Sequence, residues 1–166
     1  NLTLTNGTAT SLGGALSGTG SLIKSGAGDL TLAGPNASYN GDVLLTNGTL
    51  VIANDAAIGN GSLRTSANTK LDSDAARTIS NAVSLLGNLN LAGSHDLALN
   101  GDVSGTNGSL TKNGAANLVL NGINTCTGGT QVTSGTLLVG DSSHASARIA
   151  GPVSVSRGAS LGLSLI

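Results

Sequence analysis

One short segment of this sequence matches a pattern used for hydrolytic chemistry. Residues 158–162 spell GASLG, a GxSxG motif of the kind that presents a nucleophilic serine on a turn between a strand and a helix. That chemistry also needs an acid and a histidine later in the chain, but only four residues follow Gly162. We therefore interpret the segment as a turn followed by a strand and predict no catalytic serine.

The two histidines stand apart from other metal-binding side chains. His95 has Asp96 beside it, and neither His95 nor His144 has a second ligand at the spacing of a zinc site. The GAGD segment at residues 26–29 resembles one unit of a calcium-binding repeat, but the full pattern never recurs. The sequence therefore predicts no metal site and no cofactor.

The charged residues are too few and too scattered to indicate an enzyme or a nucleic-acid partner. Asp72 and Asp74 are close together, but no second carboxylate pair accompanies them, as glycosidase chemistry would require. Seven Lys and Arg residues, one Tyr and a net charge of −1 supply neither a basic stripe nor stacking aromatics. We predict a protein that is not an enzyme, and the sequence assigns no binding residues.

Three further residues invite a functional interpretation. Lys24 and Lys112 recur in register, 88 residues apart. We expect both to occupy outward strand positions and to point to solvent as solubilising charges. The single cysteine, Cys126, cannot close an internal disulfide, and we predict that it is a small buried apolar residue.

The composition argues against helices as the elements that carry these candidate residues. The sequence has no Glu, Met, Trp or Phe, and it is rich in Gly, Leu, Ser, Thr and Asn, which leaves few strong helix formers. Hydrophobic residues make up 39%, too many for a disordered chain. No signal peptide and no run of eighteen apolar residues is evident, so we expect a piece of a longer precursor that does not insert into a membrane.

Short aliphatic alternations recur along the whole chain. They have the period of two that is typical of strands with one buried face. Examples are Leu2/Leu4, Leu30/Leu32, Leu50/Ile52, Leu89/Leu91, Leu97/Leu99, Leu118/Leu120, Leu137/Val139 and Val153/Val155. Turn residues separate them, including eight Asn-Gly pairs, at Asn6, Asn40, Asn47, Asn60, Asn100, Asn107, Asn113 and Asn121. Six glycosylation sequons are better explained as part of this turn chemistry.

A longer repeat contains these strands. Residues 16–52 match residues 103–139, with Leu30 and Leu32 corresponding to Leu118 and Leu120. A duplication of this length suits a solenoid, whose units contact only their neighbours, better than an antiparallel sandwich. The near absence of aromatic residues and the recurring Asn-Gly turns favour the same choice. We predict an all-β fold, a three-sided parallel β-solenoid of about seven coils with about 20 to 25 residues each.

The ordered strings GSLIKSGAGDLTLAG, PNASYNGDVLLTNGTLVI and GSLTKNGAANLVLNGINTCTGGTQVTSGTLLVG resemble the passenger-associated transport repeat of autotransporter proteins. The segments between them, residues 54–93 and 141–162, look like the linking coils of the same passengers. The resemblance implies a right-handed single-stranded parallel β-helix over residues 1–166. It departs from the pattern at Cys126, where an aromatic residue is usual, and at Ala116, which replaces a Gly.

The resemblance also implies a function: the chain would be part of a type V secretion passenger of a Gram-negative bacterium. Such a passenger is exported through the periplasm and outer membrane to the cell surface. Its partner would be a C-terminal outer-membrane β-barrel in the same precursor. We expect a structural stalk that aids secretion and presents an adhesin or virulence surface. Two alternatives remain: an adhesin or effector that binds a host receptor, matrix protein or glycan through residues 72–81 and 141–150, and, less favoured, a polysaccharide-degrading β-helix enzyme.

Overall fold

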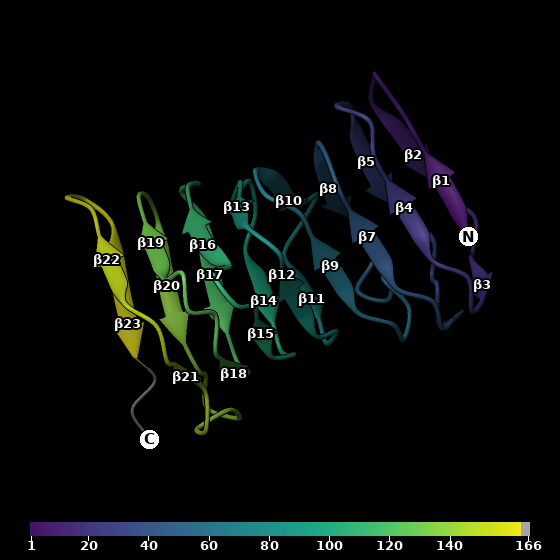
Figure 1. Cartoon of the computed structure of the whole chain (residues 1–166). Helices are drawn as coiled ribbons and strands as arrows, with labels where there is room; N and C mark the ends of the chain where they lie inside the picture. The colour runs from purple at the N-terminus through teal and green to yellow at the C-terminus, as the bar shows by residue number, and fades with distance from the viewer. Residues whose placement is uncertain (164–166) are drawn as a thin grey trace.

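The computed structural model describes residues 1–163, and this part of the chain consists of short strands joined by turns, without a helix. Every strand pair is parallel, as a β-solenoid requires. Figure 1 shows the strands side by side in one continuous stack, with the N-terminus at one end and the C-terminus at the other. The predicted all-β parallel solenoid is therefore confirmed.

Three parallel sheets form the sides of the stack. The first sheet contains β1 (Leu2–Leu4), β4 (Leu22–Lys24), β7 (Val43–Leu45), β9 (Leu63–Thr65), β12 (Val83–Leu85) and β15 (Val103–Ser104). The second contains β2 (Thr10–Leu12), β5 (Asp29–Leu32), β8 (Thr49–Ile52), β10 (Thr69–Ser73), β13 (Asn88–Leu91), β16 (Ser109–Lys112), β19 (Thr130–Val132) and β22 (Val153–Val155). The third contains β11 (Arg77–Ile79), β14 (Leu97–Leu99), β17 (Asn117–Leu120), β20 (Thr136–Val139) and β23 (Ser160–Leu163).

Two shorter pairs complete the described strands: β3 (Ser17–Gly18) with β6 (Ser38–Tyr39), and β18 (Ile123–Asn124) with β21 (Arg148–Ile149). Consecutive coils in most of the stack are 20 or 21 residues apart, as in the pairs Leu2–Leu22 and Leu22–Val43. The eight strands of the second sheet indicate about eight coils, one more than we predicted, because the coils are shorter on average.

Inward-pointing aliphatic side chains fill the space between the three sides. In β5, β8, β13 and β17, buried residues alternate with less buried ones, as predicted from the period of two. Leu30, Leu50 and Leu71 are register partners in successive coils, and all three are 0% exposed. Because each coil pairs with the next, these residues form continuous aliphatic columns.

Asparagine side chains link successive turns along the axis. The amide of Asn60 donates to Asn40 Oδ1 at 2.9 Å, and that of Asn121 donates to Asn100 Oδ1 at 2.8 Å. The Asn-Gly turns, whose recurrence favoured a solenoid, thus stack and hydrogen-bond from coil to coil at these positions.

The two copies of the long repeat lie on different sides of the solenoid. The strand of copy one that contains Lys24 is β4 of the first sheet, whereas the equivalent strand of copy two, which contains Lys112, is β16 of the second sheet. The spacing of 88 residues thus corresponds to four coils plus one side. The same sequence pattern is therefore used on two sides of the rod.

Candidate functional site

The most unusual side chains in the structure are Lys24 and Lys112, which point into the core. Lys24 is 0% exposed and Lys112 is 1% exposed. Lys24 lies between Leu4 and Leu45 in an inward column of the first sheet. Our prediction that both lysines point to solvent is therefore wrong.

The alternation of the strands explains this burial. In Leu22–Lys24 the first and third residues are buried and Ile23 points outward, so the lysine falls on the side of the inward Leu22. In β16 the inward residues are Leu110 and Lys112. In each strand the lysine follows an inward leucine by two residues, and this spacing could have predicted that both lysines point inward.

The ammonium group of Lys24 binds main-chain carbonyls at a corner of the coil. Its Nζ donates to Gly26 O, two residues later, and to Asn47 O of the next coil at 3.0 Å. A buried ammonium needs such acceptors because it has lost its hydration. The lysine therefore connects two successive coils.

Lys112 repeats this arrangement on the second sheet. Its Nζ donates to Gly114 O and, at 3.3 Å, to Ser134 O of the following coil. Gly114 and Ser134 are the repeat equivalents of Gly26 and Asn47. We call each arrangement of lysine and two carbonyls a lysine corner.

Burial disfavours the charged form of both lysines. Burial lowers the pKa of Lys24 below its usual 10.5, and the nearby Asp29 carboxylate partly opposes this effect. Burial likewise lowers the pKa of Lys112, and Asp96 opposes it. A lowered lysine pKa suits a nucleophilic amine, but the ammonium groups are directed at main-chain carbonyls, so the geometry indicates a structural role.

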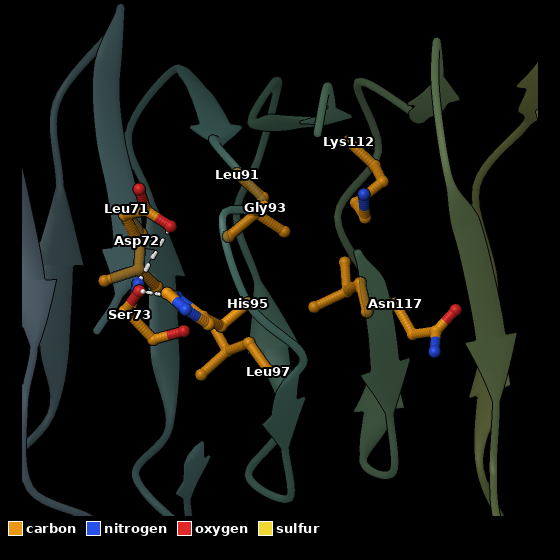
Figure 2. A pocket seen from close by; sticks show the side chains of 10 residues that line it. Leu71, Asp72, Ser73, Leu91, Gly93, His95, Leu97, Lys112 and Asn117 are labelled. Atoms are coloured by element: carbon orange, nitrogen blue, oxygen red, sulfur yellow. Dashed lines mark hydrogen bonds between the residues drawn. The ribbon is translucent and has the colours of Figure 1, made fainter. Parts of the chain in front are cut away.

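A small pocket adjoins the Lys112 corner (Figure 2). Asp72, Ser73 and His95 gather on one side of it, and His95 Nδ1 lies 2.9 Å from Ser73 O. Leucines such as Leu71 and Leu91 form much of the remaining lining. The pocket is a gap between coils with a mostly apolar wall. Asp72, His95 and Lys112 each hydrogen-bond to a neighbouring coil, whereas the buried hydroxyl of Ser73 has no hydrogen-bond partner among the described residues.

The aspartates act as links between coils. Asp42 Oδ1 accepts a hydrogen bond from the Ser62 N–H at 2.9 Å, and Asp102 Oδ1 accepts one from the Ile123 N–H at 2.7 Å. The same contact to a main-chain N–H of the next coil is made by Asp55, Asp72 and Asp96. Asp74 differs, because it pairs with Arg77 at 2.9 Å.

The second histidine belongs to the longest coil. His144 Nδ1 lies 2.7 Å from Asp141 Oδ1, and this hydrogen bond is the main reason why the pKa of Asp141 falls below 3.8. Between residues 1 and 163, no group of three or more His, Cys, Asp or Glu side chains could hold a metal ion.

Cys126 is 1% exposed and lies in the hydrophobic core, as predicted. Burial raises the pKa of its thiol. Tyr39 corresponds to it in the other repeat and is also buried, with its hydroxyl donating to Gly20 O at 2.8 Å. The GxSxG segment is a turn that leads into β23, as predicted.

The two segments considered for partner binding differ in structure. Residues 72–81 contain the end of β10 and all of β11, so they belong largely to the coil wall. Residues 141–150 belong to a coil lengthened to 25 residues between Ile123 and Arg148, and Figure 1 shows chain extending beyond the coils beside β21. A shallow groove of about 540 Å³ lies along the second sheet, lined by polar side chains that include Asn88, Thr111 and Gln131.

Residues 1–163 contain no helical segment that could span a lipid bilayer. The family model of the passenger-associated-transport-repeat matches two segments of this chain, residues 22–52 and 110–139. Both matched segments begin on a strand that carries a lysine corner. No curated protein and no solved structure matches the chain. The two matches, together with the parallel solenoid, are consistent with an autotransporter passenger domain.

Proposed function

We propose that this chain is a stalk segment of an autotransporter passenger, whose coils hold more distal parts of the passenger away from the cell. The observation that carries the proposal is that both repeat matches lie in one uninterrupted parallel stack. In such a stack each coil contacts only the coils before and after it, so the rod can be lengthened by adding coils that each extend the same narrow core.

The same architecture supports a contribution to secretion. A coil that has already folded presents an open parallel edge on which the next coil can pair. Stepwise pairing of this kind stabilises each newly exported coil and opposes its return. The lysine corners, the aspartate links and the asparagine contacts hold successive coils in register where they occur.

The experiment compares two substitutions on β17 in a complete precursor with a signal peptide, an epitope tag before residue 1 and a C-terminal β-barrel. Leu118 is 1% exposed and points inward, whereas its neighbour Val119 points outward. Leu118→Asp should strongly reduce tag display on intact cells, because it places a charge in the apolar column. Val119→Asp is the matched control and should leave display unchanged. Equal display by both variants would contradict the proposal.

The long coil favours a second candidate function, direct binding of a host receptor or glycan. Residues 141–150 extend from the solenoid wall, and projecting loops are common binding elements. Saturable binding of the purified chain to host cells or matrix, lost when this loop is shortened to the usual coil length, would support an adhesin. Binding that is absent, or that survives the shortening, would count against it.

A further inference from the structure

The Asn47–Gly48 peptide lies at the Lys24 corner in an arrangement suited to a covalent reaction. The Gly48 N–H donates to the side-chain Oδ1 of Asn47 at 2.8 Å, so the main-chain nitrogen lies against the side-chain amide of the preceding residue. Asn47 is exposed, which gives water access to this amide. Once this main-chain nitrogen loses its proton, it can attack the carbon of the side-chain amide.

Lys24 makes the same peptide more reactive. Its ammonium donates to Asn47 O at 3.0 Å, and that oxygen belongs to the peptide group whose nitrogen is the Gly48 N–H. When this N–H loses its proton, negative charge develops on the oxygen that the ammonium contacts. A cation fixed at the site of developing charge stabilises the charged intermediate.

We propose that Asn47–Gly48 is a self-modification site, at which the chain deamidates spontaneously under the influence of Lys24. The Gly48 nitrogen forms a bond to Asn47 Cγ, and the Cγ–Nδ2 bond breaks. The amide proton leaves with Nδ2 as ammonia. Water then opens the succinimide ring at either carbonyl, giving aspartate or isoaspartate without any oxidant or reductant.

The other Asn-Gly pairs lack this combination. Six of the eight asparagines have side chains hydrogen-bonded to other residues, which holds the amide in place: Asn6, Asn40, Asn60, Asn100, Asn113 and Asn121. Asn107 is exposed, but its carbonyl has no lysine contact among residues 1–163. Asn107, whose φ is +63°, is therefore the internal comparison for an exposed Asn-Gly pair without a cation, and the Lys24 variant below isolates the effect of the cation itself.

Reaction at Asn47 would alter the corner itself. Isoaspartate adds a methylene group to the main chain and turns the carbonyl that accepts the Lys24 bond into a free carboxylate. The main chain would then turn through the former side-chain carbon, and the new carboxylate would carry a negative charge beside the buried ammonium. Modification would thus change both the path of the chain and the charge at one defined contact between two coils.

The first test follows deamidation of the intact chain in mildly alkaline buffer by peptide mapping and mass spectrometry. In the folded chain Asn47 should react about tenfold faster than Asn107. This rate increase is smaller than the one produced by a donor in an enclosed oxyanion hole, because the Lys24 corner is partly open to water. In denaturant the two rates should converge, since the fold no longer positions Lys24. A folded chain in which Asn47 reacts no faster than Asn107 would overturn the proposal.

Three variants supply the controls. Asn47→Ser should abolish the reaction at this position and keep the fold, because Ser134 occupies the equivalent place in the other repeat. Lys24→Met should slow Asn47 to the rate of Asn107, whereas Lys112→Met should leave the Asn47 rate unchanged. Circular dichroism checks that each variant is folded. A folded Lys24→Met chain that deamidates at the native rate would overturn the role of Lys24.

Discussion

Lys24 and Lys112 place a cation where a solenoid core would otherwise contain an aliphatic side chain. Lys112 has Leu91 and Val132 as its register neighbours, so its methylene groups continue an apolar column. The ammonium then lies at the corner, where the chain turns and main-chain carbonyls lose their strand partners. Lysine suits this position because it combines a long apolar stem with three hydrogen-bond donors.

Replacing a corner lysine should destabilise the chain. Lys24→Met keeps the apolar stem but leaves the carbonyls of Gly26 and Asn47 without their donor, so we expect a loss of about 2 kcal/mol in the free energy of unfolding. Lys70→Met is the control, since Lys70 is an exposed residue of the second sheet. Urea denaturation measures both. Unchanged or higher stability for Lys24→Met would mean that removing the buried charge outweighs the lost hydrogen bonds.

The same lysines predict a pH dependence of stability. Burial lowers the pKa of Lys24 below 10.5 in the folded chain, so the folded chain releases this proton at a lower pH than the unfolded chain does. Between the two pKa values the unfolded chain binds more protons, and the free energy of unfolding rises with pH. Denaturation across the alkaline range up to pH 10.5 should therefore show native stability rising relative to Lys24→Met. A constant difference would contradict this linkage.

At the scale of elements, the turns depend on glycines that pack against the previous coil. Gly135 has a φ of +69°, and a Cβ built on it would lie 2.4 Å from Gly114 O, the carbonyl bound by Lys112. Gly48 is its repeat equivalent and has a φ of +75°. In each repeat the lysine, the glycine two residues after it and the later glycine with positive φ therefore form one packed corner.

Gly135→Ala should cost about 2 kcal/mol, because alanine is strained at this φ and its methyl group overlaps the neighbouring carbonyl. Gly7→Ala is the matched control, since a Cβ at Gly7 meets no atom within 4 Å. Its stability should stay within about 0.5 kcal/mol of the native value. Thermal melts compare the two, and equal melting temperatures would show that the corner can rearrange.

The strands and turns could be predicted from the sequence because each depends on local residue order. Alternation located β5, β8 and β17, and the Asn-Gly pairs located turns that link coils. The lysine corners were missed because lysine is usually exposed, and a local pattern does not show which carbonyls of the next coil lie nearby. The length of a coil could be predicted only as a range, because it depends on turns whose lengths vary along the chain.

At the scale of the molecule, stability should vary along the axis. Interior strands such as β8 and β13 pair on both sides, whereas β1 and β22 pair on one side only among the described strands. Leu2 and Val155, in those two outer strands, are 49% and 42% exposed. Since each coil contacts only its neighbours, unfolding should begin at the outer coils and proceed inward.

Hydrogen exchange followed by mass spectrometry tests this expectation. Amides of interior strands that pair on both sides, such as β8, β10, β13, β14 and β17, should be protected longest, and those of β1, β2, β22 and β23 should exchange first. Uniform protection from the first to the last strand would instead indicate one cooperative unit.

The offset of the two repeat copies constrains any ligand that recognises both. Corresponding positions are separated by four coils, about 19 Å along the axis at the usual strand spacing, and they face different directions. A flat bivalent molecule lying along a single side cannot reach both. An antibody or receptor specific for the repeat should therefore bind each copy independently, unless its two arms can reach around an edge of the rod.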